Sequence, residues 1–145
     1  MLFVWYAFFL FFLVFNVQPS TATTSRPYKD AGPTRIQALI HILDVDDVQT
    51  ADQSFHANIY VEWSWRDPRL TQENASKVIM DLNEIWHPNI QFVNQQRLWS
   101  TIPDIVQVSP GGEVTYAMRV WGSFSQPYEL REFPFDKQVF TIQLV

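Results

Sequence analysis

The chain has 145 residues, about the length of one domain, and it contains no cysteine. Disulfide bonds are therefore excluded, and the fold must be held by its own apolar core or by neighbouring subunits. The net charge of −5 is mildly acidic and argues against binding to nucleic acid.

The first segment is an apolar leader. Residues 1–15 are all apolar, and the first charge in the chain is Arg26. A membrane-spanning helix needs about 20 apolar residues, whereas signal-peptide cores are shorter. We expect a signal peptide over residues 1–22, with a short uncleaved anchor as the alternative, and export of the rest of the chain. Residues 23–35 are polar, contain Pro27 and Pro33, and predict an extended linker.

Two alternating strands are expected next. From Ile36 every second residue through Ile42 is apolar, and Phe55–Trp65 alternates still more strictly. The acidic loop Asp44–Gln53 joins the two strands. The pattern predicts an antiparallel hairpin with one buried face.

The remaining elements are shorter. Gly111–Gly112 predicts a hairpin turn between strands at 105–108 and 114–121, and a last strand is expected at 137–145 with Phe140, Ile142 and Leu144 inward. Helical periodicity is limited to one or two short turns within 73–82. Several strands separated by turns indicate an all-β domain, either a sandwich or a barrel.

No pattern points to an enzyme. The three histidines are too scattered for a zinc spacing, and the chain has neither a Gly-rich phosphate loop nor a nucleophile elbow. His41 and His56 would face each other and sense pH if the first hairpin turned near residue 48 or 49; two solvated histidines are the simpler interpretation. We expect no metal and no cofactor. Tyr60 points away from the apolar face of its strand, which is typical of a contact surface for a ligand or another subunit.

Four segments, taken in order, resemble the extracellular domain of pentameric ligand-gated ion channels, the Cys-loop receptor superfamily. They are WSWRDPRL (Trp63–Leu70), IWHPNIQFVN (Ile85–Asn94), GEVTY (Gly112–Tyr116) followed by Arg119, and LREFPFDKQ (Leu130–Gln138). The resemblance covers residues 36–145 and implies a partial, immunoglobulin-like β-sandwich that is truncated at its C-terminus. Gln126 and Phe140 occupy the positions of the two family cysteines, so the chain is similar to the prokaryotic-type members, some of which are gated by protons. Asn89 replaces the usual acidic residue.

The resemblance also implies roles for individual residues. The turn containing Asp46 and Asp47, together with the family's signature loop around Leu130–Gln138, would couple ligand binding to a membrane-embedded pore. The ligand pocket would lie between identical subunits of a pentamer and would take a small molecule or protons. Its expected contacts are Tyr60, Glu62, Trp86, Val93, Tyr116 and Arg119. The coupling residues of the signature loop are Phe133, Pro134, Phe135 and Asp136, and the structural motif residues are Trp65, Asp67, Arg69 and Pro88.

Alternative functions remain open. The expected function is that of a ligand-binding domain fragment of a channel located on the outer side of the cell membrane, with its pore in segments beyond Val145. A soluble secreted binding protein of the same fold is one alternative, and an unrelated secreted carbohydrate-binding β-sandwich is another. Asn74-Ala75-Ser76 matches a glycosylation sequon, for which chance occurrence is the default explanation.

Overall fold

The computed structural model describes residues 24–72, 76–132 and 134–145, so the expected signal peptide, the asparagine of the sequon and Phe133 lie outside the described residues. Six strands and two short 3₁₀ turns make up its regular structure. They are β1 (Ile36–Gln49), β2 (Ser54–Arg66), η1 (Pro68–Leu70), β3 (Val78–Asp81), η2 (Leu82–Glu84), β4 (Gln95–Ser100), β5 (Ile105–Val108) and β6 (Glu113–Ser125). Among the described residues, no helix is long and apolar enough to cross a membrane.

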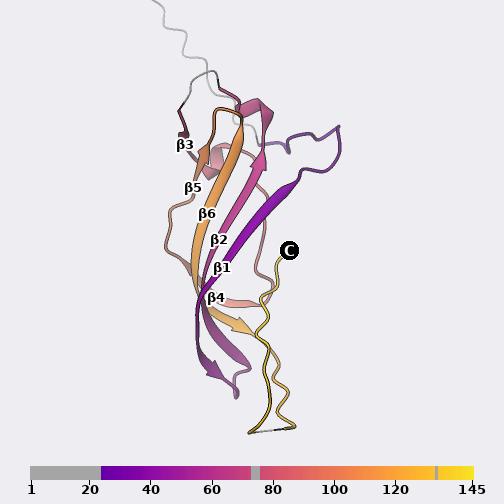
Figure 1. The fold of residues 1–145 in the computed structure, drawn as a ribbon, viewed down its shortest axis with the longest axis vertical. Helices are drawn as coiled ribbons and strands as arrows, with labels where there is room; N and C mark the ends of the chain where they lie inside the picture. Colours follow the sequence, from indigo (N-terminus) through magenta and orange to yellow (C-terminus); the bar gives the residue numbers. More distant parts are fainter. Residues whose placement is uncertain (1–23, 73–75, 133) are drawn as a thin grey trace, which may run out of the picture.

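The strands form one antiparallel sheet in the order β1-β2-β6-β5-β3, and β4 pairs with the far half of β6 (Figure 1). The β5–β6 hairpin turns at Gly111–Gly112, as predicted. Gly112 has a φ of 75°, and a Cβ there would lie 2.5 Å from the Asp67 carbonyl oxygen. The hairpin therefore packs against the end of β2 only because this position is glycine.

The core lies on one side of this sheet. Every second residue of β2 from Phe55 to Trp65 is buried, as the alternation predicted. Opposite them, the irregular segments 82–93 and 126–145 form a second layer, which contributes Leu82, Ile85, Phe92 and the half-buried Ile142. The sheet and this layer together make a sandwich in which most large apolar side chains come from β2 and β6.

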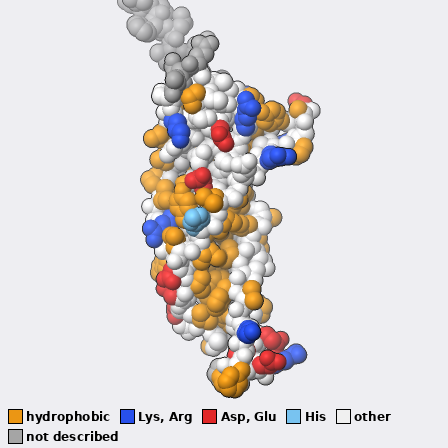
Figure 2. Space-filling view, in the orientation of Figure 1, with side chains coloured by type: hydrophobic (Ala, Val, Ile, Leu, Met, Phe, Trp, Pro, Cys, Tyr) orange, Lys and Arg blue, Asp and Glu red, His pale blue; other side chains and the backbone are white. Residues whose placement is uncertain are grey.

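The expected buried face of the first strand is not formed. β1 is an edge strand, and Ile40 and Ile42 are 46% and 60% exposed although they lie on the same side as the β2 core residues. Figure 2 shows hydrophobic side chains in a band along the face of the molecule that it displays. The strand itself forms as the alternation predicted, but nothing among the described residues packs over the edge of the sheet there.

The turn of the first hairpin also differs from the expectation. Two register irregularities, at Ile42/Asp44 and Asp46/Gln49, move the turn to residues 50–53. His41 consequently lies opposite Tyr60, and Asp46 lies opposite His56. The suggested histidine pair is therefore wrong.

Three further segments depart from the predicted elements. The described part of 73–82 contains strand β3 and the start of η2 rather than a helical turn of its own. Residues 137–145 run antiparallel to 91–94 with a single bridge, Phe92 to Leu144. Backbone hydrogen bonds join 91–93 to 143–145, whereas the backbone at 139–143 also binds the side chains of Asn94 and Gln126. Within the expected extended linker, residues 27–31 form a turn, since the Arg26 guanidinium donates to the carbonyls of Gly32 and Lys29.

Candidate functional site

The outward face of the sheet brings together three of the expected ligand contacts. Tyr60 and Glu62 lie two residues apart on β2, and the Tyr60 hydroxyl donates to a Glu62 carboxylate oxygen at 3.2 Å. Arg119 on β6 lies directly opposite Tyr60. Partial burial, and then the hydrogen bond and negative charge of Glu62, raise the pKa of Tyr60 above its ordinary 10.0. The result is a polar patch with a carboxylate, a phenol and a guanidinium.

Two neighbours complete this patch. Arg119 Nε donates to the Asn58 side-chain oxygen at 3.0 Å, and the His41 ring meets Tyr60 edge-on with centroids 6.4 Å apart. Asn58 was not among the contacts expected from the sequence, although the alternation of β2 places it on the same face as Tyr60. The hydrogen bond to Asn58 holds the Arg119 side chain across β6 and β2, so its charge is oriented before any ligand arrives.

The other expected ligand contacts lie elsewhere in the protomer. The half-buried Trp86 packs edge-on against Trp65 in the second layer, with ring centroids 6.1 Å apart, and Val93 is exposed on that layer. Tyr116 faces the core side of β6, and its hydroxyl donates to Asp104 at 2.7 Å. Within one protomer, Trp86, Val93 and Tyr116 are thus separated from the Tyr60 patch by the sheet.

The motif at the end of β2 forms a buried ion pair. Asp67 is fully buried, and Arg69 donates to its two carboxylate oxygens at 2.8 and 2.7 Å. The same carboxylate caps η1 by accepting from the Arg69 backbone N–H, and the side-chain hydrogen bonds to Asp67 raise the pKa of Arg69 further. Arg69 also binds Ser25, which ties the 24–35 segment to the domain. Pro88 is half-buried in the second layer.

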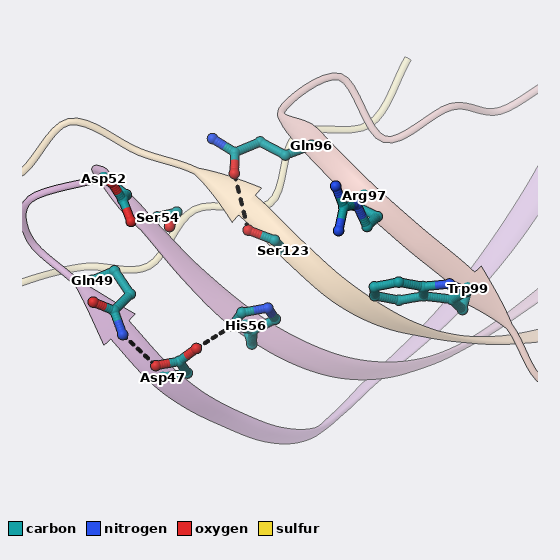
Figure 3. Close-up of a pocket in the computed structure, with 9 residues that line it drawn as sticks. All are labelled: Asp47, Gln49, Asp52, Ser54, His56, Gln96, Arg97, Trp99 and Ser123. Atoms are coloured by element: carbon teal, nitrogen blue, oxygen red, sulfur yellow. Dashed lines mark hydrogen bonds and ion pairs between the residues drawn. The ribbon is translucent and has the colours of Figure 1, made fainter.

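The β1–β2 turn carries a second polar cluster, and Figure 3 shows it around a hollow of about 530 Å³. Asp47, which has a φ of 45° within the irregular part of β1, pairs with His56 at 3.0 Å. The His56 ring stacks on Trp121 of β6 with centroids 5.7 Å apart. When protonated, His56 therefore has a carboxylate on one side and an aromatic face on the other.

Strand β4 supplies the opposite wall of the hollow. Arg97 and Trp99 project from it (Figure 3). The Trp99 ring stacks on that of Trp121, with centroids 5.1 Å apart. Gln96 accepts a hydrogen bond from Ser123, which links β4 to β6. This wall was not expected from the sequence, because residues 95–100 lack a period-two pattern and were not predicted to form a strand.

The signature loop extends from the same end of the molecule as the β1–β2 turn (Figure 1). Its first arm contacts that turn, since the Gln126 backbone N–H donates to the Gln53 carbonyl and the Tyr128 hydroxyl donates to the Ser54 carbonyl at 2.8 Å. At its tip Pro134 is exposed and Phe135 is 87% exposed, while Asp136 accepts a hydrogen bond from Gln138. Two segments expected to act in coupling are thus in direct contact.

The described residues hold no group of three or more His, Asp or Glu side chains arranged to bind a metal ion. What the geometry provides is a rigid antiparallel domain with a polar outward face at mid-height and an exposed aromatic residue at one end. Such an arrangement is typical of a binding and contact domain.

Comparison with known proteins agrees with this class. The model of the neurotransmitter-gated ion-channel ligand binding domain matches residues 20–144, and the chain belongs to that family. The all-β, sandwich fold class expected from the sequence is thereby confirmed, as is the resemblance to the pentameric ligand-gated channels.

Two curated relatives are similar to this chain at low identity. A γ-aminobutyric acid receptor subunit beta-4 of Gallus gallus is 24% identical over 127 residues, which is 82% of this chain and 26% of that protein. A proton-gated ion channel of Gloeobacter violaceus is 26% identical over 117 residues, which is 78% of this chain and 33% of that protein. The chain therefore spans between a quarter and a third of the length of these relatives.

Proposed function

We propose that this chain is the N-terminal part of the extracellular ligand-binding domain of a pentameric ligand-gated ion channel subunit, and that this domain couples binding at subunit interfaces to the opening of a transmembrane pore. The observation that carries the proposal is the family match over residues 20–144, combined with the contact between the β1–β2 turn and the signature loop at one end of the domain. No catalytic role is part of the proposal.

The exposed tip of the signature loop supports a coupling role. An aromatic side chain that is 87% exposed, as Phe135 is, leaves a large apolar surface in water unless another surface covers it. Pro134 precedes it and restricts the backbone, which stiffens the tip. A membrane-embedded domain that met this tip would bury Phe135, and a movement of the β1–β2 turn would reach it through Gln126 and Tyr128.

The distribution of the expected ligand contacts supports a pocket between subunits. The Tyr60 patch lies on the outward face of the sheet, whereas Trp86 and Val93 lie on the opposite layer. One protomer therefore presents two separate half-sites, and a ring of identical subunits would bring the outward face of each against the other layer of its neighbour. The geometry favours Arg119 over Tyr116 as the β6 contact, since the Tyr116 hydroxyl is occupied by Asp104.

The ligand class follows from the patch and the relatives together. A carboxylate at Glu62 and a guanidinium at Arg119 suit a small molecule that carries both charges, and the name of one relative includes γ-aminobutyric acid. The other relative is named as proton-gated, and the His56 ring lies 3.0 Å from the Asp47 carboxylate, which would stabilise a proton on that ring. The exposed Phe135 favours a channel over the alternative of a soluble secreted binding protein.

A chimeric channel tests the proposal. Residues 36–145 would replace the matching part of the Gloeobacter proton-gated channel, and currents would be recorded while acid, γ-aminobutyric acid and glycine are applied in turn. We expect an inward current that depends on at least one of them. A chimera that reaches the cell surface as pentamers but remains unresponsive to all three would contradict the proposal.

A further inference from the structure

The two arms of the signature loop run side by side without pairing as strands. The first arm, residues 126–131, follows the end of β6, and the second arm, residues 136–141, returns beside it (Figure 1). Among the described residues, no backbone–backbone hydrogen bond joins one arm to the other. Antiparallel segments normally meet their N–H and C=O groups by pairing with each other. The spacing of these two arms is therefore set by something other than a β ladder.

The side chain of Gln126 connects the two arms. Its Nε2 donates to the Val139 carbonyl at 2.6 Å, and its Oε1 accepts from the Thr141 backbone N–H at 2.7 Å. These two backbone groups flank Phe140 and lie on the same edge of the extended second arm. A glutamine amide carries a donor and an acceptor, as a paired backbone residue does. Gln126 therefore takes the place that a residue of a neighbouring strand would have.

Asn94 continues this edge toward the end of the chain. Its Nδ2 donates to the Thr141 carbonyl at 2.7 Å, and its Oδ1 accepts from the Gln143 backbone N–H at 3.0 Å. Beyond that point, backbone hydrogen bonds join residues 91–93 to the last residues of the chain. A hollow of about 310 Å³, lined by both amide side chains, lies between the segments. Asn94 thus links the contacts of Gln126 to ordinary backbone pairing.

Gln126 also binds the β1–β2 turn. Its backbone N–H donates to the Gln53 carbonyl at 2.7 Å, so a single residue binds the turn through its backbone and the second arm through its side chain. The exposed tip residue Phe135 lies between the two arms in the sequence. Gln126 is therefore the junction at which the turn and both ends of the loop meet.

Other contacts between the arms leave the register to Gln126. Phe140 packs against Phe55 of β2 with ring centroids 4.9 Å apart, and the Gln138 side chain donates to the Glu129 carbonyl nearer the tip. Ring packing of this kind is non-directional and allows one arm to slide along the other. The two hydrogen bonds of Gln126 are directional, and they fix which backbone groups of the second arm lie beside it.

We propose that Gln126 is a positioning residue for coupling, which joins the second arm of the signature loop to the β1–β2 turn without a covalent bond. The effect on coupling rests on the proposed function, whereas the bridge made by the Gln126 amide does not. A displacement of the turn moves the Gln126 backbone, and its side chain carries that displacement to the arm that returns from Phe135. The sequence resemblance places the two family cysteines at Gln126 and Phe140, so the bridge joins the same two points of the chain.

Amide hydrogen exchange of the ¹⁵N-labelled chain, followed by nuclear magnetic resonance, tests the bridge. Gln126→Met keeps a side chain of similar length and removes the amide, so exchange of the Thr141 N–H should become about three- to tenfold faster. The Val145 N–H donates to the backbone carbonyl of Gln91 and should exchange at an unchanged rate. Unchanged exchange within β2 shows that the domain stays folded. The same exchange rate at Thr141 in Gln126→Met and in the parent chain would overturn the inference.

A measurement on the parent chain needs no variant. The hydrogen bond from the Thr141 N–H to Gln126 should give a scalar coupling between the Thr141 amide nitrogen and the Gln126 side-chain carbonyl carbon. The bond from Val145 to the Gln91 carbonyl provides the reference. Coupling at the reference pair alone would contradict the bridge.

The positioning role is tested in the chimeric channel. Gln126→Met should lower the equilibrium constant for opening at saturating activator by about three- to tenfold, measured in single-channel recordings. Gln107→Met makes the same substitution at an exposed position on β5 and should leave opening unchanged. Equal opening in Gln126→Met and the parent chimera, at equal surface expression, would refute the positioning role. A parent chimera without current would contradict the proposed function instead, and exchange at Thr141 would still decide whether the bridge exists.

Discussion

At the residue scale, the Asp67–Arg69 pair is the most constrained interaction in the domain. The Asp67 carboxylate is fully buried and accepts from the Arg69 guanidinium and backbone. The Asp67 backbone carbonyl is the group that approaches Gly112 closely. The Arg69 side chain is 33% exposed and reaches Ser25. If one partner is removed, the charge of Arg69 is therefore partly hydrated, whereas the charge of Asp67 is not.

This asymmetry predicts different costs for the two substitutions. Arg69→Gln leaves a buried carboxylate without its charge partner and should lower the free energy of unfolding by about 3–5 kcal/mol. Asp67→Asn keeps an acceptor for the Arg69 backbone and leaves a cation that is partly solvated, so its cost should be about 1–2 kcal/mol. Urea unfolding of both variants measures the difference. Equal losses, or a larger loss in Asp67→Asn, would show that burial of the carboxylate is not the deciding factor.

At the element scale, β1 and β2 contrast within one hairpin. Ile42 and Ile59 are directly opposite each other and have the same side chain, yet Ile42 is 60% exposed and Ile59 is fully buried. Pairing alone does not bury a strand; the second layer does, and it covers β2 but not the edge.

Substituting each of these two isoleucines therefore measures how much burial contributes to stability, because the residue type and the strand pairing are the same. Ile59→Ala should destabilise the domain by about 2–5 kcal/mol through lost transfer energy and a cavity. Ile42→Ala should cost less than about 1 kcal/mol, because little apolar area leaves contact with the core. Thermal unfolding distinguishes the two. Should Ile42→Ala prove as costly as Ile59→Ala, β1 would have to be covered in solution, for instance by another copy of the chain.

The hydrogen bond from Tyr116 on β6 to Asp104 in the loop before β5 makes the free energy of unfolding decrease at alkaline pH. Burial, the hydrogen bond to Asp104 and the charge of Asp104 raise the pKa of Tyr116 above its ordinary 10.0. Its protonated form is thus favoured in the folded state, so the stabilisation is complete below pH 10.0 and is lost as the pH rises above that value. Urea unfolding at a series of alkaline pH values should show this decline, and Tyr116→Phe should reduce its slope. An unchanged slope in the variant would assign the decline to other tyrosines.

At the scale of the whole molecule, two ends of the domain carry different chemistry. The buried Asp67–Arg69 pair adjoins the β5–β6 turn, since the Asp67 backbone N–H donates to the Gly112 carbonyl. The signature loop, with its exposed Phe135, extends from the opposite end (Figure 1). The Tyr60 patch lies between them on the outward face. Because β2 runs from the β1–β2 turn to the Asp67 corner, it connects all three regions as one stiff element.

Local sequence patterns predicted best the strand whose two faces differ most in burial, which is β2. Strict alternation in β2 identified its buried residues one by one and placed Tyr60 and Glu62 together. Glycines at 111 and 112 located the second hairpin. Burial of β1 was beyond such reasoning, because an apolar residue on an edge strand is buried only if another segment packs over it.

Long-range pairing accounts for the rest of what the sequence did not predict. Arg119 faces Tyr60 only because of the β2–β6 register, and β4 exists only as a partner of β6. The Asp47–His56 pair depends on a register irregularity in β1 that has no signature in the sequence. Propensity and alternation carry no information about such contacts, since each joins strands that are far apart in the chain or locally out of register.

The most direct measurement for the proposed coupling role is the maximal open probability of the chimeric channel with Phe135→Ser. Its matched control is Ile79→Ser, which removes another exposed apolar side chain, 65% exposed on β3 and distant from the signature loop. We predict a lower maximal open probability at saturating activator for Phe135→Ser and an unchanged value for Ile79→Ser, at equal surface expression. An unchanged open probability in Phe135→Ser would contradict the claim that this end of the domain transmits binding to a pore.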